Sequence, residues 1–157
     1  MANDNKQYIG EFAGKYRFLS NFAPVYFGVV LDGETYPTVE HAYQAAKTFD
    51  AKERTFIRML SKPGQAKRAG RSVRLRGDWD AVKLDIMLHL LRQKFGNARL
   101  RDALLATGDS ELVEGNYWGD TFWGKCAGVG DNHLGRLLMQ VREEIQDGTQ
   151  NTEKCKR

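Results

Sequence analysis

Residues 36–47 read Tyr-Pro-Thr-Val-Glu-His-Ala-Tyr-Gln-Ala-Ala-Lys, and this stretch predicts a short amphipathic helix. Thr38 is a natural N-cap, and the proline before it holds the entering chain extended. From there, Glu40, Gln44 and Lys47 fall at i, i+4 and i+7, so their side chains lie along one face of the helix. An acid, an amide and an amine therefore share one polar stripe.

The opposite arc of this helix carries the residues expected to pack on the core, which are Val39, Ala42, Tyr43, Ala46 and Phe49. The polar stripe itself has two interpretations. It is either the solvated face of an ordinary amphipathic helix or the lining of a cleft in which a carboxylate and an amine act on a substrate.

The composition indicates one globular domain without a membrane span. The chain has 157 residues, of which 41% are hydrophobic and 28% charged, which is enough for one core of ordinary size. We expect a single domain over residues 1–148 and a polar, disordered tail over 149–157. No stretch of about 18 apolar residues predicts a membrane helix, and the first residues carry no secretory signal.

Cysteine and histidine usage bears on compartment and metal binding. Cys126 and Cys155 are the only cysteines. Because they do not make the disulfide framework of a small secreted domain, we expect a cytoplasmic protein. His41, His89 and His133 are far apart and match no metal-ligand spacing, so we expect no metal site and no cofactor. No heptad repeat indicates an oligomeric state, which stays open.

A basic run lies between residues 62 and 76. It contains six bases and no acid, namely Lys62, Lys67, Arg68, Arg71, Arg74 and Arg76. Such a run attracts the phosphates of a nucleotide or of a nucleic-acid backbone. It is equally compatible with a solvated helix face followed by a basic loop.

The order of the expected elements is typical of an α+β fold, a compact helix-rich domain with a small β-sheet. Aromatic and β-branched residues predict strands at 8–12 and 26–31, and Asp32-Gly33 predicts a tight turn into 34–36. Helices are expected at 38–49, 51–60, within 64–69, and at 78–95, 97–108 and 132–145, with a short strand at 111–114 and a structured loop at 116–131.

An aromatic, glycine-rich segment at 114–124 reads Glu-Gly-Asn-Tyr-Trp-Gly-Asp-Thr-Phe-Trp-Gly. Its rings suit either a wall for a flat, polar ligand or a tight aromatic corner of the core. Asp120 and Trp123 are three residues apart, so one short turn would aim both at the same place. A second carboxylate near aromatic walls fits cleavage of a glycosidic bond, which needs an acid or base and stabilisation of an oxocarbenium-like centre.

Two further segments carry residues that could bind a ligand. Asn21 and Phe22 lie just before an expected strand, where the asparagine either forms a turn or hydrogen-bonds a ligand. Trp79 lies between two acids at the start of the long helix. Its ring either anchors the core or offers a stacking surface for a planar base.

Four phrases of this sequence resemble those of the NADAR (YbiA-like) N-glycosidase family, in the same order and from about Ile9 to about Ile145. They are Phe18-Leu19-Ser20-Asn21-Phe22, the stretch 36–47, Asp120-Thr121-Phe122-Trp123-Gly124 and Gly130-Asp131-Asn132-His133-Leu134-Gly135. The resemblance implies a compact, helix-rich α+β fold and hydrolysis of an N-glycosidic bond. It implies two substrate classes. One is the phosphoribosylated pyrimidine intermediates of riboflavin biosynthesis, and the other is ADP-ribose attached to guanine; whether guanine within DNA is a substrate stays open.

The family pattern also implies which residues act. It places functional residues at Glu40, Trp79, Asp120 and Trp123, with Lys47 as a candidate nucleophile, and this sequence fills all five positions. We therefore expect Glu40 and Asp120 to divide the acid–base work. The two tryptophans would stack on the departing base.

The expected substrate-binding residues include the basic run and the polar stripe. Lys67, Arg68 and Arg71 are the candidates to hold a phosphate or diphosphate. The remaining candidates for substrate contact are Asn21, Phe22 and Gln44.

Lys47 has two possible roles. In a covalent route its neutral amine attacks the anomeric carbon, and the opened sugar is carried as a Schiff base until water releases it. In a direct route it stays an ammonium that orients Glu40 or a sugar hydroxyl. The covalent route needs a lowered pKa, which partial burial beside other cations favours and the Glu40 carboxylate opposes.

Two other readings compete with an enzyme. The chain could be a nucleotide-binding or nucleic-acid-binding module without chemistry, since basic residues and aromatics suit that role too. It could also be an inert α+β scaffold whose aromatics all belong to the core, in which case replacing Trp79 or Trp123 by alanine would unfold it.

Overall fold

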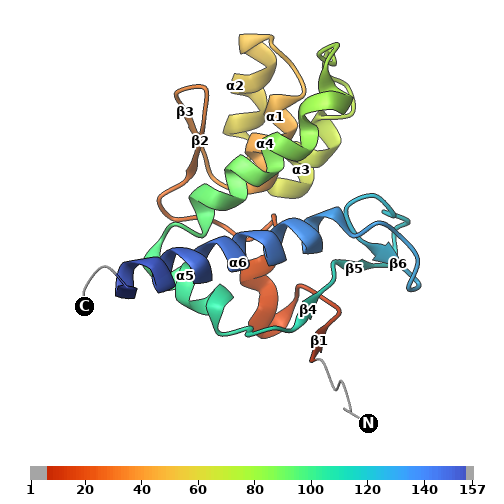
Figure 1. The fold of residues 1–157 in the computed structure, drawn as a ribbon. Helices are drawn as coiled ribbons and strands as arrows, with labels where there is room; N and C mark the ends of the chain where they lie inside the picture. The colour runs from red at the N-terminus through yellow and green to blue at the C-terminus, as the bar shows by residue number, and fades with distance from the viewer. Residues whose placement is uncertain (1–6, 155–157) are drawn as a thin grey trace. The chain divides into compact units, whose positions relative to one another are not determined.

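The computed structural model describes residues 7–154, with side chains through residue 148 (Figure 1). The chain divides into two compact units. One is the segment Asn21–Lys94, and the other combines the residues before it with those after it. Every helix among the described residues is too short or too polar to span a lipid bilayer.

The unit Asn21–Lys94 begins with a β-hairpin. Strand β2 (Val29–Leu31) pairs antiparallel with β3 (Glu34–Tyr36). Asp32 and Gly33 connect the strands with φ of 49° and 83°, the left-handed backbone that a tight two-residue hairpin turn requires. The expected hairpin is therefore present, although its first strand begins at Val29 rather than at residue 26.

Four helices complete this unit. They are α1 (Val39–Ala46), α2 (Ala51–Met59), α3 (Pro63–Ala69) and α4 (Trp79–Lys94). Side-chain caps begin the first two: the Thr38 hydroxyl accepts from the backbone N–H of His41, and the Asp50 carboxylate accepts from two N–H groups of α2. Helix α3 begins instead at Pro63, whose fixed φ suits a first helical position that needs no N–H partner.

Helix α1 is the centre of the unit. It packs against α2, α3, α4 and the hairpin (Figure 1), and all its residues are buried. Glu40 is only 7% exposed and Gln44 only 4%. The interpretation of the polar stripe as a solvated face is therefore wrong for these two residues. Phe49, expected on the packing face, is 67% exposed, because the helix ends at Ala46 and Phe49 lies beyond it.

The second unit contains short strands and two helices. Strand β1 (Tyr8–Ile9) pairs parallel with β4 (Glu111–Leu112), and β5 (Gly115–Asn116) pairs parallel with β6 (Lys125–Cys126). A 3-10 helix covers Gly14–Leu19, and the two α-helices are α5 (Ala98–Leu105) and α6 (His133–Lys154).

The fold has the expected helix-rich α+β class, but its β-structure is more divided than expected. The described residues form three separate two-stranded sheets rather than one small sheet. Strands of two residues are too short to show an alternating pattern, so the sequence did not separate them from loops. Helix α6 runs past its expected end at residue 145 to Lys154. Residues 155–157 and the side chains of 149–154 lie outside the described part of the chain, and the disordered tail stays a prediction.

Candidate active site

The carboxylate of Glu40 is held in the interior of the unit Asn21–Lys94. Its residue lies in the first turn of α1, where the backbone N–H donates to the Asn21 carbonyl at 3.1 Å. One turn later, Gln44 Nε2 donates to Glu40 Oε1 at 2.6 Å. The i, i+4 spacing seen in the sequence thus becomes a direct hydrogen bond that orients a buried acid.

The other end of the Gln44 amide meets Gly70. Gln44 Oε1 is buried and has no hydrogen-bond partner among the described residues. It lies so close to Gly70, which follows α3, that a Cβ at this position would overlap it. The backbone of Gly70 is ordinary right-handed helix, so space rather than conformation requires a glycine here.

Lys47 lies at the end of α1, half-buried beside two aromatic rings. Its Nζ is 5.7 Å from the ring centroid of Tyr43 and 6.0 Å from that of Trp79. The two rings pack on each other with centroids 5.1 Å apart. Trp79 is buried, which leaves little of its ring accessible for stacking on a departing base. Its observed contacts are with Tyr43 and the Lys47 amine.

Burial lowers the pKa of the Lys47 amine, because removal from water disfavours the charged form. The Glu40 carboxylate opposes this and raises the pKa, whereas Arg71, Lys67 and Lys83 lower it further. The net direction is downward. The expected combination of partial burial and neighbouring cations is present, and so is the expected opposition of Glu40.

The basic run divides between two places. Lys67 lies with its Nζ 6.0 Å from the ring centroid of Phe22. Lys67 and Arg71, which are four residues apart in the chain, both lower the pKa of Lys47. Arg68 instead lines a separate hollow between α2 and α3. Lys83, which the sequence analysis did not single out, also acts on Lys47 and pairs with Asp80 at 3.0 Å. Its position four residues after Trp79 in α4 was a signal that could have found it.

Asn21 and Phe22 border the same region. Asn21 is buried, and its Nδ2 lies 3.5 Å from the sulfur of Met87 on α4. Its Oδ1 has no hydrogen-bond partner among the described residues. Unsatisfied buried carbonyls are rare in native proteins, and they often mark a place where a ligand or water donates.

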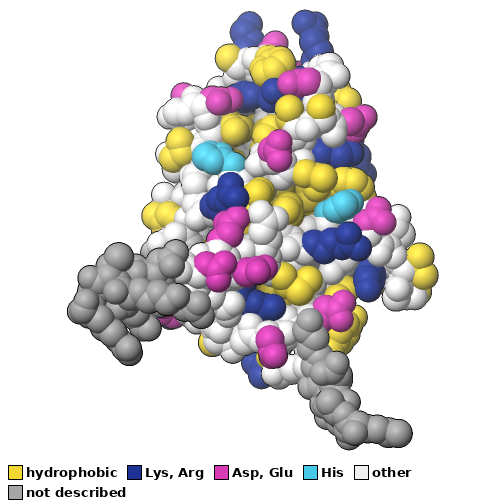
Figure 2. All heavy atoms as spheres, viewed as in Figure 1, with side chains coloured by type: hydrophobic (Ala, Val, Ile, Leu, Met, Phe, Trp, Pro, Cys, Tyr) yellow, Lys and Arg dark blue, Asp and Glu magenta, His cyan; other side chains and the backbone are white. Residues whose placement is uncertain are grey.

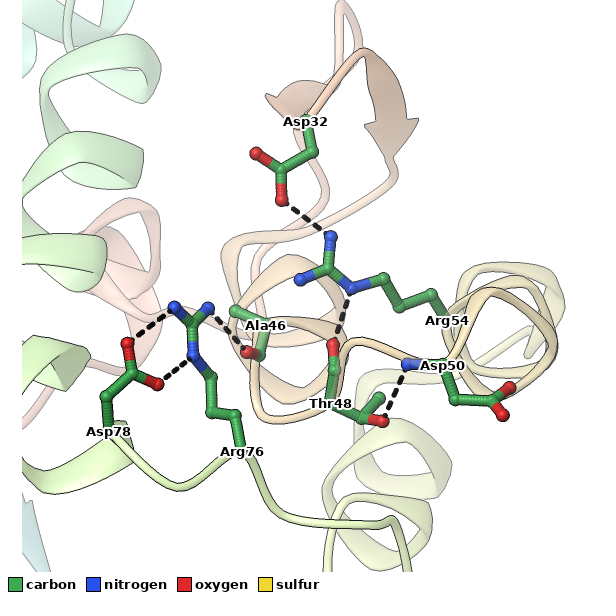
Figure 3. Close-up of polar contacts among 7 residues, drawn as sticks. All are labelled: Asp32, Ala46, Thr48, Asp50, Arg54, Arg76 and Asp78. Carbon is green, nitrogen blue, oxygen red and sulfur yellow. Dashed lines mark hydrogen bonds and ion pairs between the residues drawn. The ribbon is translucent and has the colours of Figure 1, made fainter.

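Arg76 fixes the backbone that carries Lys47. Its backbone N–H donates to the Lys47 carbonyl at 2.7 Å. Its Nη1 donates to the Ala46 carbonyl at 3.4 Å (Figure 3). The same guanidinium donates from Nε and Nη2 to the two carboxylate oxygens of Asp78, at 2.6 and 3.0 Å. Because Asp78 directly precedes Trp79, this pair ties the end of α1 to the start of α4.

Arg54 holds the carbonyl that follows Lys47 in the same turn. Its Nε donates to the Thr48 carbonyl at 2.7 Å, and its Nη1 pairs with Asp32 at 2.6 Å (Figure 3). The last carbonyls of a helix have no partner within it, and cations stabilise its negative end. No basic residue lies in the last turn of α1, so distant arginines supply these charges.

His41, which lies inside the resembling stretch, has a structural role. Its Nε2 lies 2.9 Å from the Leu60 carbonyl, and its Nδ1 lies 2.7 Å from the Thr38 hydroxyl. A carbonyl only accepts, so the proton is on Nε2 and the hydroxyl donates to Nδ1. Burial lowers the pKa of this imidazole, which favours the neutral form.

Asp120 and Trp123 belong to the second unit, where one turn joins them as the sequence analysis expected. Asp120 Oδ1 accepts from the backbone N–H groups of Phe122 at 3.1 Å and Trp123 at 2.9 Å. The side chain of Asn116 in turn bonds the N–H and the carbonyl of Asp120. One carboxylate oxygen is therefore engaged in holding the turn, and Trp123 packs edge-on against Phe122 with centroids 4.9 Å apart.

No group of three or more His, Cys, Asp or Glu side chains within the described part of the chain is arranged to hold a metal ion. The candidate residues of the unit Asn21–Lys94 instead form a buried acid, an amine with a lowered pKa and a set of cations. This combination suits acid–base and nucleophilic chemistry on an anionic substrate.

Comparison with known proteins places the chain in a family. The family model described as "NADAR domain" matches residues 7–146. "N-glycosidase YbiA" of Escherichia coli (strain K12) is 45% identical over 137 residues, which cover 83% of this chain and 82% of that protein. "Riboflavin biosynthesis protein VVA0006" of Vibrio vulnificus is 40% identical over 134 residues, which cover 83% of this chain and 36% of that longer protein.

A solved structure supports the same assignment. The NMR structure of the E. coli protein YbiA superimposes with a TM-score of 0.77 at 39% sequence identity, covering 94% of this chain and 93% of that one. Both the expected α+β fold and the expected class of enzyme agree with these relatives. The chain belongs to the NADAR family, and its reaction is the hydrolysis of an N-glycosidic bond.

Proposed function

We propose that this chain releases the base from a phosphoribosylated pyrimidine of the riboflavin pathway, giving ribose 5-phosphate and the free pyrimidine. The observation that carries the proposal is the placement of the Lys47 amine beside Tyr43 and Trp79, within electrostatic reach of Glu40 and of three cations. A phosphate on the sugar supplies the negative charge that Lys67, Arg71 and Lys83 would bind. The name of the Vibrio relative points to the same pathway.

In the covalent route, Lys47 acts as the nucleophile. Its neutral amine attacks C1′ of the sugar, the C1′–N bond to the base breaks, and the base leaves with a proton from an acid. The ring oxygen then takes up a proton as the ring opens, which leaves a Schiff base between C1′ and Lys47. Water adds to C1′, the C1′–N bond to Lys47 breaks, and the sugar and the free amine are restored.

Glu40 and Asp120 would share the protons of this sequence. Glu40 is suited to take the proton that Lys47 loses, because the bond from Gln44 fixes its carboxylate. The resemblance assigns the second acid–base role to Asp120, one of whose oxygens holds the turn to Trp123. In the direct route, Glu40 would activate water and Lys47 would remain an ammonium.

A side-by-side product assay tests this proposal. The substrates are the ribosylated pyrimidine phosphate and guanine carrying ADP-ribose, as the nucleoside and within DNA, and the proteins are wild type, Glu40→Gln and Lys47→Arg. We expect wild type to release the pyrimidine fastest and Glu40→Gln to lose at least about a hundredfold in rate. Circular dichroism spectra of the variants serve as the control for folding.

The outcomes separate the remaining alternatives. Faster cleavage of the guanine conjugate would make ADP-ribosylated guanine the preferred substrate, while the reaction would still be hydrolysis of an N-glycosidic bond. Binding of both substrates without any product would favour a non-catalytic binding module. Borohydride reduction during turnover would add the mass of the sugar phosphate to Lys47 on the covalent route, whereas full activity of Lys47→Arg would exclude that route.

The cytoplasm remains our proposed location. Cys126, the cysteine that lies within the described residues, is a free thiol. A pathway intermediate with a phosphate is charged and stays in the compartment where it is made, so its hydrolase would act there.

A further inference from the structure

A hollow between α2 and α3 is separate from the region around Lys47. Its volume is about 570 Å³, in the range of pockets that hold small molecules. One stripe of α2, spaced at helical intervals, forms one side, and one stripe of α3 with the residues that follow it forms the other.

The floor of the hollow is apolar. Phe56 of α2 lines it together with Leu60, Ala69 and Val73. Phe56 is 62% exposed although it belongs to a helix of a folded unit. In the view of Figure 2, hydrophobic side chains lie among basic and acidic ones over the part of the surface at the top, where Figure 1 places α2. An exposed aromatic ring in a concave site is a surface on which a flat apolar group gains contact.

The rim of the hollow offers hydrogen-bond donors. The Arg68 guanidinium forms no hydrogen bond or ion pair with another described residue. Gln65 uses its Oε1 to accept from the Ser61 hydroxyl and from the Lys62 N–H. Its amide N–H donors form no hydrogen bond with another described residue. Lys52 adds a second cation to the lining.

The one acid of the lining does not neutralise these donors. Glu53 accepts a hydrogen bond from the Thr48 hydroxyl through Oε2. Both of its carboxylate oxygens also accept from the backbone N–H of Arg74, at 3.1 and 3.2 Å. Its carboxylate is therefore already engaged by Thr48 and Arg74, whereas Arg68 and Lys52 are the two cations of the lining.

The sequence position of Arg68 explains why it serves a different place from its neighbours. Successive residues of an α-helix point about 100° apart. Lys67 of α3 and Arg71 beyond its end lower the pKa of Lys47, whereas Arg68 and Gln65 share another face of α3 and line the hollow. The basic run that looked like one phosphate site is thus two groups of cations.

We propose that this hollow binds a small planar organic anion, with its ring on Phe56, Leu60 and Val73 and its carboxylate, sulfonate or phosphate on Arg68. The apolar floor selects the ring, and the guanidinium offers two parallel N–H donors that match two oxygens of such a group. This site is independent of the proposed catalytic residues.

Fluorescence titration with 1-anilinonaphthalene-8-sulfonate tests the proposal on the full chain. We expect saturable one-to-one binding that phenyl phosphate displaces and the neutral benzyl alcohol does not. Arg68→Gln and Phe56→Ala should each weaken binding at least about tenfold, because each removes one half of the recognition. The matched controls are Arg74→Gln and Met59→Ala, which remove an exposed arginine and an exposed apolar side chain outside the lining. They should change binding less than about twofold.

Three results would overturn the proposal. The first is binding that does not saturate or that the control variants weaken equally. The second is loss of binding in Lys67→Gln rather than in Arg68→Gln, which would place the anion near Lys47. The third is a dimer in sedimentation equilibrium whose formation Phe56→Ala abolishes, which would make a second copy of the chain the occupant.

Discussion

Gly70 leaves the space that the side-chain carbonyl of Gln44 occupies, since a Cβ there would overlap it, and the same amide donates at 2.6 Å to Glu40. A residue outside α1 therefore fixes the position of the acid that α1 carries. Gln44 cannot yield space at Gly70 without weakening its bond to Glu40, because both ends of its amide are confined in the interior.

Gly70→Ala should reduce kcat/KM at least about tenfold, because a displaced Gln44 no longer orients Glu40. Overpacking should also lower the free energy of unfolding by about 1–3 kcal/mol. The matched control is Gly64→Ala in the first turn of α3, where an added Cβ meets nothing within 4 Å. We expect this control to keep activity and to gain about 0.4–1 kcal/mol of stability. Equal activity of the two variants in steady-state assays would contradict the role of Gly70.

Arg76→Lys should lower kcat with little change in KM. Lysine keeps the charge and the backbone N–H to Lys47 but loses the paired bonds to Asp78, so the Lys47 turn and the start of α4 become less fixed. We expect a decrease of about tenfold in kcat. The rate at which an amine-selective reagent labels Lys47, followed by mass spectrometry, should change in parallel.

Arg74→Lys is the control for this effect, since it alters an exposed arginine two residues away. A drop in thermal stability without any change in kcat or in Lys47 labelling would show that Arg76 is only structural. The labelling readout also works if Lys47 turns out not to be the nucleophile.

Lys83→Met should move the pH profile of kcat/KM to higher pH. Lys83 is one of the cations that lower the pKa of Lys47, so its removal lets that pKa rise. On the covalent route the rate rises with pH through the pKa of Lys47, and on the direct route it falls. The midpoint moves upward in both cases. Lys62→Met, which removes an exposed lysine outside the group of cations that lower the pKa of Lys47, should leave the midpoint in place.

Asp120→Asn should retain the fold and lose activity. The asparagine Oδ1 can still accept from the N–H groups of Phe122 and Trp123, whereas the amide cannot act as an acid or base. We expect a loss of at least about a hundredfold in kcat. Asp120→Ala removes the turn bonds as well and should cost about 1 kcal/mol of stability. Wild-type turnover in Asp120→Asn would show that Asp120 holds the turn but takes no part in acid–base catalysis.

The sequence predicted α1 well because its signals are local. The Thr38 cap and the i, i+4 pair of Glu40 and Gln44 both appear as expected. The fit of Gly70 against Gln44 and the bonds from Arg76 to the end of α1 join residues far apart in the chain, and no local pattern encodes them. The placement of Lys67 and Arg68 on different faces of α3 follows from helical spacing alone, so the sequence could have predicted it.

Lys94 should make stability depend on pH. It is 1% exposed at the end of α4, and burial lowers its pKa from 10.5 to about 7. Between these two values the unfolded chain binds more protons than the folded one, so the free energy of unfolding rises with pH. The slope of this increase reaches about 1.4 kcal/mol per pH unit. It disappears below the folded pKa, where the lysine is charged in both states and the number of bound protons no longer differs.

Lys94→Met isolates this contribution, because methionine has a similar length and does not titrate. Urea unfolding at pH 7.5, 8.5 and 9.5 should show a smaller increase of stability with pH in the variant than in wild type. The variant should also be the more stable protein at neutral pH, since no amine then has to stay neutral in the interior. Parallel slopes in the two proteins would mean that Lys94 keeps an ordinary pKa, with its charge compensated in the folded state.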